Sequence, residues 1–206
     1  MGLLGIPTRA NKKKQGNVGN SKYYKRNNYS NPDAVENLIH YITRTRVNED
    51  RAQDLLAYGA AGAGYYLHPD DMIQQFLYVQ NIYGINRRGG KRMYHEVFNL
   101  YDCEAIELNC DPIQLGQVGM ECCQIYFQMG FQAVFAVHWE AGKRYHFHFA
   151  VNSINFIDGR KWHTSIPEIR QREEIFNQIL WERQKAFNGV YMPLYFLDDP
   201  QSVHTF

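Results

Sequence analysis

Three of the chain's eight histidines lie close together in the segment HWEAGKRYHFHFAVN, which runs from residue 138 to residue 152. Neutral imidazole nitrogens bind divalent ions such as Mn²⁺, Zn²⁺ and Ni²⁺, so three converging imidazoles would form a metal site. Glu140 follows the first of these histidines by two residues, and its carboxylate could orient one of them through a hydrogen bond. Whether the imidazoles converge depends on the strands that carry them.

Two predicted strands carry the histidines, FQAVFAVHW over residues 131–139 and RYHFHFAVNSINF over residues 144–156. Because side chains alternate along a strand, His146 and His148 share one face of the second strand, and the opposite face is apolar. The link between the strands is short and predicts an antiparallel hairpin, which would place His138 beside the other two. The histidines could instead only line a polar sheet face. Three imidazoles at this spacing, on strands expected to pair, favour the metal site.

The rest of the chain supplies the elements that must position this hairpin. An Asp158-Gly159 turn after the second strand is typical of a further hairpin. The glycine-rich segment GAAGAGYYLHP matches no phosphate-binding loop and indicates a flexible turn. Apolar periodicity and capping residues predict helices over residues 30–44, 48–59, 68–84, 111–130 and 166–187, and a strand over residues 91–102. We expect an α/β fold with a central, mainly antiparallel sheet, helices packed on one face and the metal site on the opposite face.

Charge is distributed unevenly along a chain whose net charge is only +1. Residues 1–30 are rich in Asn, Lys, Gly and Tyr without periodicity, which predicts a flexible basic arm, although a solvated tail with no partner has the same composition. One domain is expected over residues 31–190 and a tail over residues 191–206. The basic residues expected to contact phosphates are Lys22, Lys25, Arg26, Arg44 and Arg46.

Other features of the composition narrow the protein class. No run of residues is long and apolar enough to cross a membrane, and the first residues do not resemble a signal peptide, so a cytoplasmic protein is expected. The four cysteines form no CxxC pair and are expected to be buried thiols. The 15 tyrosines and 12 phenylalanines can fill a core or stack on unpaired bases.

The histidine segment also resembles the third motif of conjugative relaxases. In HWEAGKRYHFHFAVNSIN, a histidine is followed by an acidic residue two positions later, then by His-hydrophobic-His, and then by an asparagine four residues after the last histidine. DGRKWHTS is similar to the segment after this motif in mobilisation nucleases of the MobA-like (MOBP) class. AVENLIHYITRTR resembles the helix of their nucleophilic tyrosine, and HPDDMIQQFLYVQNIYG and RMYHEVFNL resemble the next helix and strand. The resemblance spans roughly residues 31–165.

The resemblance implies a relaxase of the His-hydrophobic-His endonuclease superfamily. Such an enzyme nicks one strand at a transfer origin, keeps the 5′ end as a phosphotyrosine and later rejoins the strand, for conjugative transfer of a plasmid or mobile element. Carried over by position, Tyr41 is the nucleophile, Glu140 is the acidic catalytic residue, and His138, His146 and His148 hold Mn²⁺ or Mg²⁺. The implied partners are single-stranded origin DNA, accessory DNA-binding proteins and a type IV secretion coupling protein in a bacterial cytoplasm.

Several positions depart from the family pattern or leave alternatives. Asn99 stands where the second motif usually has serine, and Glu140 where aspartate is common; Asn99 and Asn152 are expected to contact DNA. From spacing alone, Tyr41 could be a core aromatic residue of its helix. The rival nucleophiles are Tyr23, Tyr24 and Tyr29. His95, beside the second motif, is expected to have a structural role.

Two other functions remain open. A rolling-circle replication initiator uses the same histidine arrangement, but its tyrosine commonly follows the histidines, whereas here the tyrosine comes first. A non-catalytic DNA-binding or metal-binding module of the same fold would keep the histidines without forming a covalent bond to DNA. Covalent capture of a cut oligonucleotide would exclude the second alternative.

Overall fold

The computed structural model describes residues 3–5, 29–46, 53–63, 68–85, 89–100, 108, 111–139 and 145–197. These residues contain a five-stranded sheet of order β1-β3-β5-β4-β2, in which every neighbouring pair is antiparallel. The strands are β1 (Leu3–Gly5), β2 (Leu55–Ala61), β3 (Met93–Asn99), β4 (Phe131–Trp139) and β5 (Tyr145–Asn155). The long helices are α1 (Ala34–Thr43), α3 (Pro69–Ile82), α6 (Pro112–Gln128) and α7 (Ile166–Leu197). The predicted α/β class with an antiparallel sheet is confirmed.

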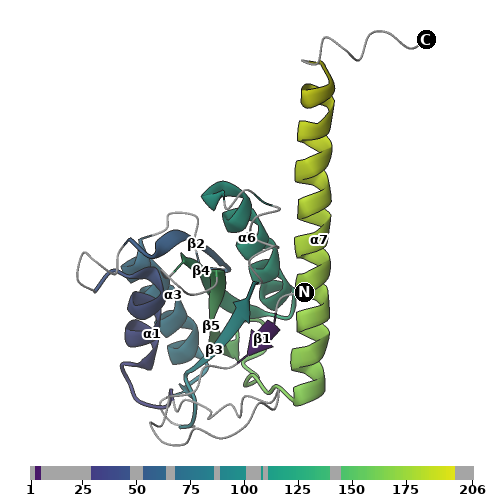
Figure 1. The fold of residues 1–206 in the computed structure, drawn as a ribbon. Coiled ribbons are helices and arrows are strands. Elements are labelled where there is room, and N and C mark those ends of the chain that lie inside the picture. Colours follow the sequence, from purple (N-terminus) through teal and green to yellow (C-terminus); the bar gives the residue numbers. More distant parts are fainter. Residues whose placement is uncertain are drawn as a thin grey trace, which may run out of the picture.

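Helices cover both faces of the sheet (Figure 1). On the apolar face, α6 and α7 pack over large aromatic residues that include Phe135, Phe147 and Phe149. On the histidine face, α1 and α3 pack over smaller apolar residues that include Val134 and Ala150. The sequence predicts helices on the apolar face only, whereas the structure has helices on both faces. The second helical layer forms because the histidine face is polar at one end of the strands and apolar in the middle, and the apolar part must be covered.

The ends of α1 and α3 follow from local sequence. His68 precedes α3, its side chain accepts a hydrogen bond from the Asp70 backbone N–H, and Pro69 occupies the first helical position. α1 ends at Arg44, which has a left-handed backbone conformation (φ 57°), and its N–H bonds to the carbonyl oxygen of His40. Because α1 ends here, Tyr41 lies in its last turn, above the sheet.

Three segments differ from the sequence-based prediction. The helix predicted over residues 48–59 is wrong, because residues 55–61 form β2, which pairs with β4. The unpaired edge of β4 offers a row of backbone hydrogen bonds, and this tertiary pairing overrides the local helical pattern. Residues 3–5, within the predicted arm, form β1 on the edge of β3, and residues 6–28 lie outside the described residues. α7 continues to Leu197, past the helix end predicted at residue 187.

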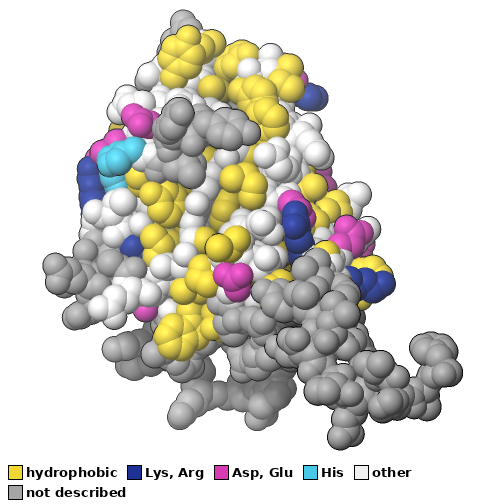
Figure 2. Space-filling view, turned by 90° about the horizontal axis from the view of Figure 1, so that it is seen from above, with side chains coloured by type: hydrophobic (Ala, Val, Ile, Leu, Met, Phe, Trp, Pro, Cys, Tyr) yellow, Lys and Arg dark blue, Asp and Glu magenta, His cyan; other side chains and the backbone are white. Residues whose placement is uncertain are grey.

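An apolar hollow lies between β2 and α6, on the face away from the histidines. It is lined by Leu56, Ala57, Tyr58, Pro112, Ile113, Gly116, Gln117, Met120 and Phe135. None of these side chains is charged, so the hollow offers no positive charge to a phosphate. On the side of the molecule seen from above, hydrophobic side chains likewise gather in a band across the middle, and the described Lys and Arg side chains are scattered (Figure 2). Among the described residues, no helix has the length and hydropathy needed to span a bilayer.

Candidate active site

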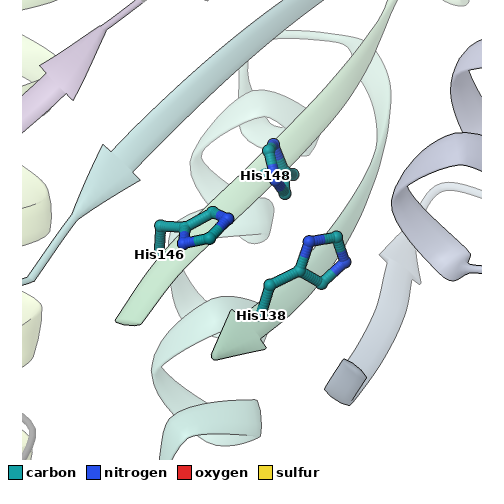
Figure 3. A group of neighbouring side chains, drawn as sticks. All are labelled: His138, His146 and His148. Atoms are coloured by element: carbon teal, nitrogen blue, oxygen red, sulfur yellow. The ribbon is translucent and has the colours of Figure 1, made fainter. Parts of the chain in front are cut away.

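The three histidines of the HWEAGKRYHFHFAVN segment converge at one end of the β4–β5 hairpin. His138 of β4 stands opposite His146 of β5, and His148 stands opposite Ala136. The three imidazole rings gather on one face of the sheet (Figure 3). One nitrogen from each ring lies within 4.8 Å of the others, so the group could hold a metal ion. The predicted convergence is therefore confirmed, and it results from the alternation and antiparallel register of the two strands.

Two of the imidazoles are oriented by hydrogen bonds on their outer side. Nε2 of His138 donates to the carbonyl oxygen of Ile42, at 2.6 Å, and Nδ1 of His148 is hydrogen-bonded to Nε2 of His95, at 2.8 Å. The inner nitrogens, His138 Nδ1 and His148 Nε2, are buried without any hydrogen-bond partner. A buried polar nitrogen without a partner is costly, and coordination to a metal ion would satisfy both. The donor set therefore fits a divalent ion.

Burial keeps the imidazoles in the form that binds metal. Burial, together with the positive charge of Arg44, lowers the pKa of His138 to about 3. Burial also lowers the pKa of His148 well below the usual value, with a contribution from His95. Near neutral pH both rings are therefore uncharged and have a lone pair available, which is the state that a metal ligand requires.

Tyr41, in the last turn of α1, lies beside this cluster. Its ring centroid lies 5.8 Å from that of His148 and 6.0 Å from that of His95, with edge-to-face geometry in both cases. Its side chain is 45% exposed, although most of α1 around it is buried. The alternative of a core aromatic residue does not fit this exposure. The hydrogen bond from His138 to Ile42, the residue after Tyr41, ties the last turn of α1 to the histidine cluster.

Arg44 brings a buried positive charge to the same place. Its residue exposure is 6%, and its guanidinium carbon lies 5.3 Å from the centre of the Tyr41 ring. It is the one residue other than glycine with positive φ among those the structure describes. A left-handed backbone at a residue with a side chain costs about 1–2 kcal/mol, and such strain is concentrated at functional sites. The charge of Arg44 also lowers the pKa of His148, so its field reaches the cluster.

His95 and Tyr29 make contacts at the histidine cluster that the sequence does not predict. His95 lies on β3, opposite Ala150 of β5 and next to His148, and only 3% of it is exposed. The hydroxyl of Tyr29 lies 3.0 Å from Nδ1 of His95. Alternation along residues 91–102 does put His95 and Asn99 on one face, but only the pairing of β3 with β5 puts that face beside the histidines.

The other residues predicted for the site have different surroundings. Asn99 is half-buried at the end of β3, opposite His146, and so borders the histidine cluster. Arg46 is exposed and forms an ion pair with Glu36. Glu140, Lys22, Lys25 and Arg26, together with the rival tyrosines Tyr23 and Tyr24, lie outside the described residues.

Asn152 has a structural role instead of the expected contact with DNA. It is fully buried, its amide nitrogen donates to Phe76 O and Gln132 Oε1, and its amide oxygen accepts from Gln80 Nε2 and from the Ile154 backbone. These bonds use both ends of the amide, so no polar atom remains for a phosphate or a base. This corrects the expectation from its position on the histidine face.

Comparison with known proteins agrees with this geometry. The family described as "Relaxase: MobA/VirD2-like, nuclease domain" matches residues 41–184, well over half of the chain. The chain belongs to the relaxase family. The match begins at Tyr41 and includes all three histidines, so the matched region contains the histidine cluster together with Tyr41 and Arg44. A search of curated proteins finds no match to the chain.

Family membership gives the site its chemical context. Relaxase nuclease domains act on DNA, and in this relaxase the histidine cluster, Tyr41 and Arg44 occupy one end of the sheet. A histidine cluster suited to a divalent cation, a solvent-exposed phenol and a guanidinium can together bind and attack a phosphodiester. The apolar hollow beside α6 is lined by neither an imidazole nor a guanidinium and lies on the opposite face of the sheet.

Proposed function

We propose that the chain is a metal-dependent relaxase that cuts single-stranded DNA at a transfer origin by tyrosine transesterification. In the proposed reaction, the Tyr41 oxygen forms a bond to the scissile phosphorus, and the bond from phosphorus to the 3′ oxygen breaks. The Tyr41 hydroxyl loses its proton, and the departing 3′ oxygen gains one. One phosphodiester replaces another, so the strand can be rejoined by the reverse reaction without ATP.

The observation that carries this proposal is the position of Tyr41. An exposed phenol lies against the ring of His148, and His138 donates a hydrogen bond to the adjacent residue, Ile42. A phosphate that reached the inner nitrogens of the cluster would therefore also be near the Tyr41 hydroxyl. A divalent ion bound by the three histidines would polarise the phosphate oxygens and neutralise charge in the transition state.

The proposed biological role is transfer of a plasmid or mobile element in a bacterial cytoplasm. Accessory DNA-binding proteins and a type IV secretion coupling protein would be the partners of such a nuclease. Asn99, at the border of the cluster beside His146, is proposed to contact the DNA strand there. Glu140 directly follows β4 in the chain and is proposed to act on His138 or on a transferred proton.

Removal of metal is expected to abolish the reaction. The protein is mixed with labelled single-stranded transfer-origin DNA and Mn²⁺, with and without EDTA, and run on a denaturing gel. A band of protein joined to DNA should appear with Mn²⁺ and disappear with EDTA, because EDTA removes the divalent ion that would polarise the phosphate oxygens in the transition state. DNA that is always released intact would support the non-catalytic module. An equally intense band in EDTA would show that the reaction does not depend on metal.

Arg44 is proposed to act on the reacting phosphate and not as a surface contact. Arg44→Gln is expected to slow formation of the covalent complex by about 10²-fold, because a buried charge beside the ring of the attacking tyrosine is lost. Arg46→Gln is the matched control, since Arg46 is exposed and paired with Glu36, and its effect should be small. Rates are measured at saturating DNA. Equal rates in the two variants would remove Arg44 from the reaction.

A further inference from the structure

We propose that Tyr29, His95 and His148 form a directed hydrogen-bond relay that fixes His148 in one tautomer and aims its Nε2 lone pair at the metal ion. This inference rests on the proposed metal centre. The relay runs across three segments of the fold, from the residues before α1, through β3, to the middle of β5.

The direction of the relay follows from counting protons. If His148 Nε2 binds the ion, the proton of the neutral ring must be on Nδ1, which then donates to His95 Nε2 at 2.8 Å. His95 Nε2 must then be an acceptor, so the His95 proton is on Nδ1, which donates to the Tyr29 oxygen at 3.0 Å. The reverse direction would put a proton on His148 Nε2, pointing into the cluster, and would block coordination. Only one arrangement of protons is therefore compatible with metal binding.

The two buried ligands are oriented in different ways because of where they lie. His138 is near the end of β4 and reaches a backbone carbonyl of α1, that of Ile42. His148 lies inside the sheet, between β3 and β4, where neighbouring backbone groups are used in strand pairing. A side chain must therefore supply its acceptor. His95, which is 3% exposed, occupies that position on β3.

Tyr29 is itself held in place, so the relay has a fixed outer end. Its carbonyl oxygen accepts from the Arg92 backbone N–H at 2.7 Å, immediately before β3. Its ring lies edge-to-face with His95, with 6.1 Å between centroids, and packs on the apolar cluster under α1 and α3. A partner fixed in this way restricts rotation of the His95 ring, and an oriented His95 restricts His148.

The test is the affinity of the metal-free protein for Co²⁺, measured by calorimetry without DNA. His95→Leu should weaken Co²⁺ binding by about 10- to 100-fold, because the outer partner of a ligating imidazole is lost. His95→Gln should recover most of the affinity, since its amide oxygen can accept from His148 Nδ1. Tyr29→Phe should cause a smaller loss, on the order of 10-fold or less. Tyr83→Phe is the matched control, because it removes a hydroxyl bonded to the remote Phe156 carbonyl and should leave affinity unchanged.

A double variant distinguishes a relay from independent effects. In the His95→Leu background, Tyr29→Phe should cause no further loss, because the link between Tyr29 and the metal ligand is already broken. Thermal unfolding of each metal-free variant checks that the chain is folded, and if His95→Leu does not fold, the comparison of Tyr29→Phe with Tyr83→Phe decides. Equal Co²⁺ affinity in Tyr29→Phe and Tyr83→Phe, or wild-type Co²⁺ affinity in His95→Leu, would overturn the relay and leave the proposed metal centre intact. A wild-type chain without saturable Co²⁺ binding would overturn the metal centre and the relay together.

Discussion

Replacing Tyr41 with phenylalanine is expected to abolish the covalent complex with DNA, with a loss of at least about 10³-fold in its rate of formation. The substitution removes one oxygen and keeps the ring that packs against His95 and His148. Metal affinity and DNA affinity should therefore remain close to those of the wild-type chain. The measurements are the denaturing gel with Mn²⁺, Co²⁺ calorimetry and a DNA-binding titration.

The matched control for Tyr41 is an exposed tyrosine on the neighbouring helix. Tyr78 lies on α3 and is 67% exposed, so Tyr78→Phe also removes a solvent-exposed hydroxyl and should keep full activity. Mass spectrometry of the wild-type complex should find the DNA fragment on Tyr41. A complex that still forms in Tyr41→Phe would transfer the nucleophile to Tyr23, Tyr24 or Tyr29. Among these, Tyr29 would be the first to test, because its hydroxyl contacts His95.

The second large effect is expected on stability, at a buried ion pair between α7 and the sheet. Arg172 of α7 donates from Nη2 and Nε to the two carboxylate oxygens of Glu96 on β3, at 2.6 and 3.2 Å. Tyr126 donates to the same carboxylate, and Thr164 accepts from Arg172. Glu96 and Arg172 are 1% and 3% exposed. Arg172→Met should destabilise the protein by about 3–5 kcal/mol, because it leaves the Glu96 charge buried without its partner.

Urea unfolding followed by circular dichroism measures this loss, and α7 supplies its own control. Arg183 pairs with Glu121 of α6, but both side chains are about one-third exposed, so Arg183→Met should cost less than about 1 kcal/mol. Replacing both Glu96 and Arg172 by apolar residues should recover much of the stability, since no uncompensated charge remains. Equal destabilisation by Arg172→Met and Arg183→Met would mean that the Glu96 pair does not anchor α7.

Together these contacts show how the two helical layers serve different purposes. The layer of α6 and α7 packs on large aromatic residues and is joined to the sheet by the Glu96–Arg172 pair. The layer of α1 and α3 packs on smaller residues and brings Tyr41 and Arg44 to the histidines. Substitutions in the first layer should therefore change stability, and those of Tyr41 and Arg44 should change the reaction.

Residue patterns along the chain are enough to predict the parts of the protein that depend on neighbouring residues. The alternation of FQAVFAVHW and RYHFHFAVN, with a short link between them, is enough to predict a hairpin that gathers His138, His146 and His148, because strand geometry repeats every two residues. Helical spacing and capping residues likewise predicted α1, α3 and α6 within a few residues of their observed ends. The relaxase resemblance is confirmed by the family match, and the choice of Tyr41 as nucleophile, which the resemblance implies, stays a prediction.

The segments that are distant in the sequence and meet at the site could not be predicted from local patterns. The pairing of β3 with β5 makes His95 a neighbour of His148, and it turns Asn152 into a buried structural amide. The edge of β4 makes residues 55–61 a strand despite their helical pattern, and the apolar middle of the histidine face brings α1 over it. These outcomes depend on which surfaces bury one another when the whole chain folds, and no local spacing of residues records that choice.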